Sequence, residues 1–392
     1  MRKNILKSLL CMAIGVAVTA TAPTISEAGP REQAKRMHDR LAGVPPDGAT
    51  LDAMEAALIN NDVIGAANIA MQNPHFYSSA IKNFAAPWTN VDQTVFTDLN
   101  DFTATVVGIV RDDRPFTDAL TADLVYVGAP GVVPTAYSHT DNNHYIELEQ
   151  NRVDLADPNA FIPVAQSSLP GAQLDGANTA GVLTSRAAGL AYLDMGTNRR
   201  LWRYTAMNFL CRDMEELNDI TRTADRVRQD VTRSPGGDSR IYHNTCVGCH
   251  NGMDPLSGAF AYLDWDNEME RTIFPPGMVR PKYFNGETTF PFGFVTIDDR
   301  WDNYWRNGPN ANLGWRAAES GGFGPKGLGT EIAMSRAFSE CKVEQVFERI
   351  CLRTPRDPAE RAEVARIADV FEAQNYSMRR VFAEVSGYCR GQ

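Results

Sequence analysis

The sequence predicts a mainly α-helical protein, with a helical N-terminal domain, a loop-rich region and a C-terminal helical bundle. Apolar residues recur at helical spacing in the first third of the chain and again from Thr330 to Tyr388. Residues 253–329, in contrast, are rich in Gly, Pro, Trp, Tyr and Phe and contain no long periodic run. We therefore expect helices at both ends of the chain and irregular structure before the tail.

Three helices are predicted in the first third of the chain. Pro30–Leu41 opens with a proline, which is suited to the first turn of a helix. Apolar side chains share one face of Leu51–Ile59 and one face of Asp101–Arg111. Because these faces need a common core, an α-helical domain is the economical prediction.

Loops are expected from 124 to 181, because Gly and Pro recur there and interrupt any periodic run. Helices should resume over Gly181–Leu193 and over Arg199–Leu217, and the second of these has an apolar face. The segment TRSPGGDSR at 232–240 then breaks the chain sharply.

The C-terminal region is predicted to cover residues 236–392. Before the tail it contains one clear helix candidate, near Asp298–Arg306. The tail itself is predicted to form three helices, which are Thr330–Leu352, Pro358–Ala373 and Ser377–Tyr388.

Residues 1–28 have the pattern of a secretory signal peptide. Basic residues precede an apolar run, and small residues follow it, with a predicted cleavage site after Ala28. The apolar run is too short to span a bilayer, and no later segment indicates a membrane anchor. We therefore expect a periplasmic or secreted protein without a membrane span, whose first domain covers 29–235.

The chain is acidic, with a formal net charge of −10. Loss of residues 1–28 makes it more acidic, because they carry three basic residues and one acidic residue. An acidic surface disfavours binding to nucleic acid and to anionic membranes. It attracts partner proteins that have a basic docking face.

The cysteines predict two disulfides. Of the seven, one lies in the predicted signal peptide, and two of the remaining six stand close together at 246 and 249. In an oxidising compartment the other four can form two structural bridges. Three antiparallel tail helices would bring Cys351 and Cys389 to the same end. We therefore predict the pair Cys351–Cys389, which leaves Cys211–Cys341 as the second bridge.

The stretch IYHNTCVGCHNG at 241–252 carries the strongest chemical signal in the chain. Covalent haem needs two thiols on one side of a helical turn and a nitrogen ligand next to them. Cys246, Cys249 and His250 meet these demands, and Asp238 or Ser239 is suited to cap a short helix that runs into Cys246. The motif predicts one covalently attached haem c, with His250 as the proximal iron ligand.

Two other interpretations of the motif are weaker. A thioredoxin-like redox pair follows a buried parallel strand, and no Val/Ile-rich strand precedes Cys246. A zinc site needs two further ligands. His243 is near, but the sequence offers no evident fourth ligand.

The sixth iron ligand is left open by the sequence. Met278 stands in a Pro/Gly loop of the kind that presents methionine to haem, although it is only 28 residues from His250. Met334 and His144 are alternatives. Met253 is too close to His250 to reach the opposite face of the ring.

Several stretches resemble the secreted bacterial planctomycete-type cytochrome c family. They are GVLTSRAAGLAYLDMGTNRRLWRYTAMNFLC (181–211), CVGCHNGMDPLSGAFAYLDWD (246–266) and GLGTEIAMSRAFSECKVEQVFERICLRTP (327–355). The resemblance supports haem attachment at Cys246, Cys249 and His250 and implies a cytochrome c-like region within 236–392. It supplies neither a substrate nor a distal ligand, and this chain lacks the extra modules of the commoner pattern.

The expected function is that of an exported monohaem c-type cytochrome, which carries single electrons between redox partner proteins. The alternative is a haem-dependent oxidoreductase, peroxidase- or oxidase-like, with an open sixth iron site. In that case the loop-rich segments 125–180 and 270–325 would form the pocket. A third interpretation is an accessory protein in which the haem is structural.

Overall fold

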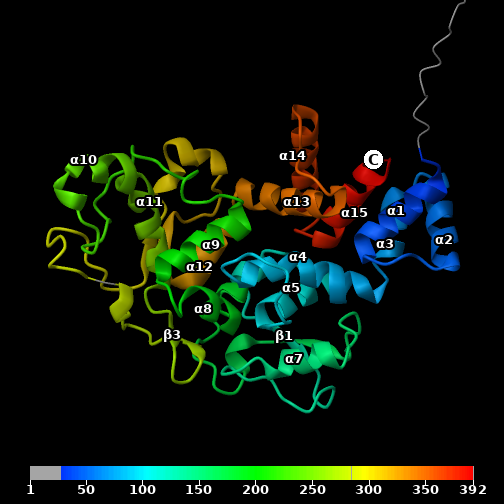
Figure 1. The fold of residues 1–392 in the computed structure, drawn as a ribbon, viewed down its shortest axis with the longest axis horizontal. Coiled ribbons are helices and arrows are strands. Elements are labelled where there is room, and N and C mark those ends of the chain that lie inside the picture. Colours follow the sequence, from blue (N-terminus) through cyan, green and yellow to red (C-terminus); the bar gives the residue numbers. More distant parts are fainter. Residues whose placement is uncertain (1–27, 284, 392) are drawn as a thin grey trace, which may run out of the picture.

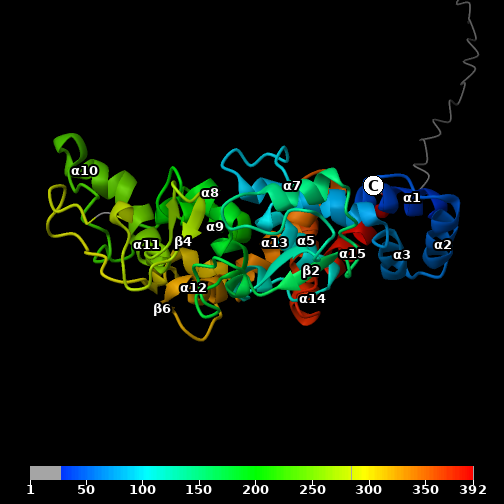
Figure 2. The ribbon, with the colours of Figure 1, turned by 90° about the horizontal axis from the view of Figure 1, so that it is seen from below.

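The computed structural model describes residues 28–283 and 285–391. The predicted signal peptide therefore lies outside the described residues, except for Ala28. Within these ranges no helix has the length and apolar character needed to cross a membrane. The molecule is elongated, with helices α1 (Pro30–Ala42), α2 (Gly48–Ile59) and α3 (Val63–Ala70) at one end and α10 (Ser239–Ile241) at the other (Figure 1, Figure 2).

The fold is mainly α-helical, as predicted, and its strands are short. Each of the three two-stranded sheets seen in the described part of the chain is antiparallel. They pair β1 (Val125–Gly128) with β2 (Phe161–Val164), β3 (Asp264–Asp266) with β4 (Arg271–Ile273), and β5 (Arg300–Asp302) with β6 (Gly321–Phe323).

Helix α5 lies at the centre of the molecule and covers Asp101–Arg111, the predicted range. Every residue of α5 is buried. A Cβ atom on Gly108 would lie 2.1 Å from the ring of Tyr126, so the glycine allows β1 to pack directly on the helix. The N-terminal helices reach α5 through a π-helical turn at Phe76–Ile81 and α4 (Lys82–Ala85).

The predicted loop region from 124 to 181 contains β1, β2 and α7 (Asn143–Gln150). Two helices follow, α8 (Arg186–Tyr192) and α9 (Asn198–Leu210). The prediction of a helix reaching Leu217 is wrong. Helix α9 ends at Leu210 because Cys211 has a left-handed backbone, with φ 52°.

The predicted helix at Asp298–Arg306 is also wrong. The chain there forms β5 and then a 3₁₀ turn at Tyr304–Arg306. Trp301 is 2% exposed and pairs with Gly322, whose missing side chain leaves room for the indole. The aromatic side chains are therefore buried by sheet pairing, which local spacing does not reveal.

The tail helices pack against the N-terminal helices and against α9. The predicted helix Thr330–Leu352 is two helices, because Ser335 caps the second by accepting a hydrogen bond from the Phe338 amide at 3.1 Å. The last helix contacts α1 and α3, and the one after the break contacts α9. The tail helices are α12 (Gly324–Ala333), α13 (Arg336–Cys351), α14 (Pro358–Ala373) and α15 (Met378–Tyr388).

Both predicted disulfides are confirmed. Cys211, at the end of α9, is bonded to Cys341 on α13. Cys351 is bonded to Cys389, which joins the ends of α13 and α15. Cys246 and Cys249 are unpaired.

Candidate functional site

The two unpaired cysteines lie on a continuous helical segment at one end of the molecule (Figure 1). The Asp238 carboxylate caps α10 by accepting a hydrogen bond from the Arg240 amide at 2.9 Å, as predicted. The chain then passes through a π-helical turn, Tyr242–Cys246, into α11 (Val247–Ser257). Such π turns are rare and often mark functional positions.

The rear face of α11 is held tightly by the rest of the fold. A Cβ atom on Gly248 would lie 1.6 Å from Asn218 Oδ1, and one on Gly252 would lie 2.0 Å from the Trp305 Nε1 atom. Asn251 is fully buried and donates to the carbonyl oxygen of Asp219 at 2.6 Å. These contacts fix the rotation of the helix about its axis.

The opposite face of α11 carries the motif. Cys246 ends the π turn, and Cys249, His250 and Met253 lie on α11. Cys249 and His250 are adjacent, and each is three or four residues from both Cys246 and Met253, so these side chains point towards the same side of the helical segment. Both thiols are partly exposed. Burial raises the pKa of the Cys249 thiol, and the neighbouring Cys246 adds to this shift.

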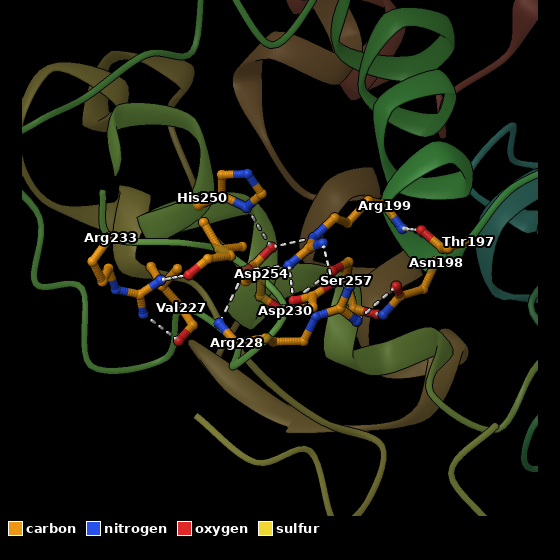
Figure 3. Close-up of polar contacts among 11 residues, drawn as sticks. Thr197, Asn198, Arg199, Val227, Arg228, Asp230, Arg233, His250, Asp254 and Ser257 are labelled. Atoms are coloured by element: carbon orange, nitrogen blue, oxygen red, sulfur yellow. Dashed lines mark hydrogen bonds and ion pairs between the residues drawn. The ribbon is translucent and has the colours of Figure 1, made fainter. Parts of the chain in front are cut away.

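His250 is bound through one ring nitrogen. Its Nδ1 atom lies 3.1 Å from Oδ1 of Asp254, one helical turn further along α11 (Figure 3). The Nε2 atom has no hydrogen-bond partner among the residues that the structure describes. The imidazole is therefore held in place while a ligating nitrogen stays available.

Asp254 is the centre of a buried ion-pair network (Figure 3). Its side chain is 0% exposed and accepts from Arg199 Nε at 2.6 Å and Arg199 Nη2 at 2.8 Å. The same guanidinium binds Asp230 at 2.7 and 3.0 Å. Burial alone would raise the pKa of Asp254, but Arg199 and His250 hold that pKa well below its usual value. The carboxylate is therefore ionised.

A groove of about 320 Å³ lies next to the motif. Its lining includes Met253 of α11 and Met214, whose carbonyl oxygen is 3.4 Å from Cys249 Sγ, but not the motif residues Cys246, Cys249 and His250. Among the described residues Arg200 makes no ion pair, whereas Arg203 binds Asp213. The groove is lined by Val91, Arg199, Arg200, Arg203, Tyr204, Met214 and Met253.

The three candidates for the sixth iron ligand lie elsewhere than in this groove lining. Met278 is 58% exposed, and its Sδ atom lies 3.8 Å from Arg280 Nη1. Met334 is 37% exposed and caps the end of α12. His144 is buried, with Nε2 accepting from the Gly128 amide at 2.9 Å and Nδ1 donating to the Thr135 carbonyl oxygen at 2.7 Å. Both of its nitrogens hold α7 to its surroundings.

Sequence reasoning missed Met214 and the arginines of α9 as neighbours of the motif. No sequence spacing relates these residues to His250, because they come close to α11 only in the folded chain. The contact of Asp254 with His250 could have been predicted from the sequence, because a carboxylate four residues after a histidine in a helix lies beside that histidine.

The donor set fits covalent haem better than it fits a zinc ion. Two free thiols and a histidine with a free Nε2 stand on one face of a fixed helix. Within the described part of the chain, no group of three or more His, Cys, Asp or Glu is arranged to hold a metal ion, so the further ligands for zinc are lacking there.

Comparison of the chain with known protein families, with curated proteins and with solved structures gave no match.

Proposed function

We propose that this protein is an exported monohaem c-type cytochrome of the planctomycete-type cytochrome c family that it resembles. Cys246 and Cys249 would form the thioether bonds to one haem c, and His250 would ligate its iron through Nε2. The observation that carries this proposal is the helical segment at the start of α11, where two free thiols precede a histidine already held by its other nitrogen.

The bound haem would supply one-electron chemistry, and the chain would supply burial, orientation and charge. The groove next to Met253 offers apolar and cationic surface for this purpose. Arg200, which has no ion-pair partner in the described residues, is suited to bind a haem propionate. The region 236–392 would then be the cytochrome c-like part of the molecule.

The expected partners are redox proteins with a basic docking face, because the chain carries a net charge of −10. The expected location is the periplasm or the cell exterior. The two disulfides agree with an oxidising compartment.

The test is production of the full chain in a bacterium that attaches haem c in its periplasm. The wild type should retain haem after acid–acetone extraction and give the pyridine haemochrome spectrum of two thioether bonds. Cys246→Ala/Cys249→Ala should lose the covalent haem, and His243→Ala, a change at an exposed neighbour, should keep it. Extractable haem in the wild type, or retained haem in the double variant, would refute the proposal.

A haem-dependent oxidoreductase is the second candidate, and the groove favours it. Of the three arginines that line it, Arg199 and Arg203 are paired with carboxylates, and Arg200 is the cation that the groove offers to a small anionic substrate. This candidate requires an open sixth iron site, whereas an electron carrier does not.

A further inference from the structure

We propose that Asp254 is a positioning residue that makes His250 a stronger donor to haem iron and so lowers the reduction potential of the protein. This inference rests on the proposed function and deepens it. It concerns the proximal ligand His250 and does not depend on which residue is the sixth ligand.

Asp254 contacts His250, and its other contacts hold its carboxylate in place. Its Oδ1 atom faces both His250 Nδ1 at 3.1 Å and Arg199 Nε at 2.6 Å. Its Oδ2 atom accepts from Arg199 Nη2 at 2.8 Å and from the Arg228 amide at 3.2 Å. Every contact except the one to His250 holds the carboxylate in place, so the direction of its bond to the imidazole is preset.

The surroundings keep this carboxylate ionised and dry. Asp254 has a fully buried side chain, and Arg199 neutralises it through a two-point contact. Asp230 on the far side of Arg199 is balanced in turn by Arg228, whose Nη2 atom is 3.5 Å away. Water therefore does not compete for the Asp254 carboxylate, and a hydrogen bond to an ionised acceptor is roughly twice as strong as one to a neutral acceptor.

The consequence falls on the other ring nitrogen. A histidine whose N–H is held by a carboxylate has more negative charge on its ligating nitrogen. That charge stabilises ferric iron more than ferrous iron, because the ferric ion is more positive. The pair His250–Asp254 therefore favours the oxidised state compared with a histidine bound to a neutral acceptor.

The experiment compares Asp254→Asn with Asp230→Asn in the covalently loaded full-length protein. The amide introduced by Asp254→Asn would be a weaker, neutral acceptor for the imidazole, whereas Asp230→Asn leaves the His250–Asp254 bond in place and disturbs the same network. We expect Asp254→Asn to shift the equilibrium constant for reduction at least tenfold towards the ferrous form, which is about 59 mV for a one-electron couple. Asp230→Asn should shift it much less. Equal potentials in the two variants would overturn the inference and leave only a structural role for Asp254.

A measurement on the wild type tests the inference even if Asp254→Asn does not fold. In the loaded protein with nitrogen-labelled histidine, the Nδ1 proton of His250 should exchange with water much more slowly than the ring protons of the exposed His243. Equally fast exchange would overturn the inference. Absence of covalent haem would instead refute the proposed function, so the two failures are distinguishable.

Discussion

Cys249 Sγ donates a hydrogen bond to the carbonyl oxygen of Met214 at 3.4 Å. Met214 follows shortly after Cys211, where the disulfide to Cys341 ties the end of α9 to α13. In the same loop Asp213 is bound to Arg203 on α9, with two contacts of 2.7 Å. One wall of the candidate site is therefore fixed by a covalent bridge to the tail of the chain.

This connection predicts that the two disulfides differ in their effect on the haem. Removal of either pair, as Cys211→Ala/Cys341→Ala or Cys351→Ala/Cys389→Ala, should lower the free energy of unfolding by about 2–5 kcal/mol. Only the first pair should also change the visible spectrum of the bound haem, because it loosens the loop beside Cys249. Urea unfolding and absorption spectra check this. Spectral changes of equal size in both variants would contradict it.

The close contact of Gly252 with Trp305 predicts that this position admits no side chain. Gly252→Ala places a carbon about 2 Å from the indole, so α11 or the indole must move. We expect a loss of about 1–3 kcal/mol in the free energy of unfolding. Gly48→Ala in α2 is the matched control, since nothing lies within 4 Å of its added carbon. Equal unfolding midpoints for the two variants in urea would show that the contact does not matter.

Asp299 predicts a pH dependence of stability. Burial raises the pKa of its carboxyl to about 6 in the folded protein, from an ordinary value of 3.8. The folded state therefore holds this proton more tightly than the unfolded state does. The resulting stabilisation is complete below the unfolded pKa and is lost as the pH rises through the folded pKa. Asp299→Asn should thus gain about 1 kcal/mol relative to the wild type between pH 4 and pH 7, allowing for solvent screening. Urea unfolding at both pH values measures it, and a difference that does not change with pH would contradict it.

Carbon monoxide separates the two candidate functions. An electron carrier with two strong axial ligands should show a low-spin ferrous spectrum that carbon monoxide leaves unchanged. An oxidoreductase with an open site should bind carbon monoxide rapidly. We expect the spectrum to stay unchanged. A rapid shift of the Soret band on addition of carbon monoxide would instead favour the haem-dependent oxidoreductase.

Local patterns predicted the helices whose limits are set locally. Asp101–Arg111 and Pro358–Ala373 have the predicted limits, and Asn100 and Asp357 cap their first turns through their own side chains. The end of α9 at Leu210 was not predictable in this way, because a left-handed cysteine at 211 ends the helix and no glycine or proline marks the position. The strand at Arg300–Asp302 likewise depends on a partner strand further along the chain.

The residues of the candidate site also differ in whether the sequence alone reveals them. Cys246, Cys249 and His250 are neighbours in sequence, so the prediction of haem attachment needs only their spacing. Arg199 and Asp230 reach Asp254 from separate segments, and their approach is a property of the folded chain. No periodicity marks such ion pairs before the fold is known.

The proposed function requires that Cys246 and Cys249 carry haem. Trypsin cleaves after Arg240 and Arg271, so both cysteines fall in the single peptide 241–271. Mass spectrometry of this peptide, from protein produced with an active haem c attachment system, is the most direct measurement. The peptide should carry the mass of one haem after acid–acetone extraction. A peptide with two free thiols, or with Cys246 and Cys249 joined as a disulfide, would contradict it.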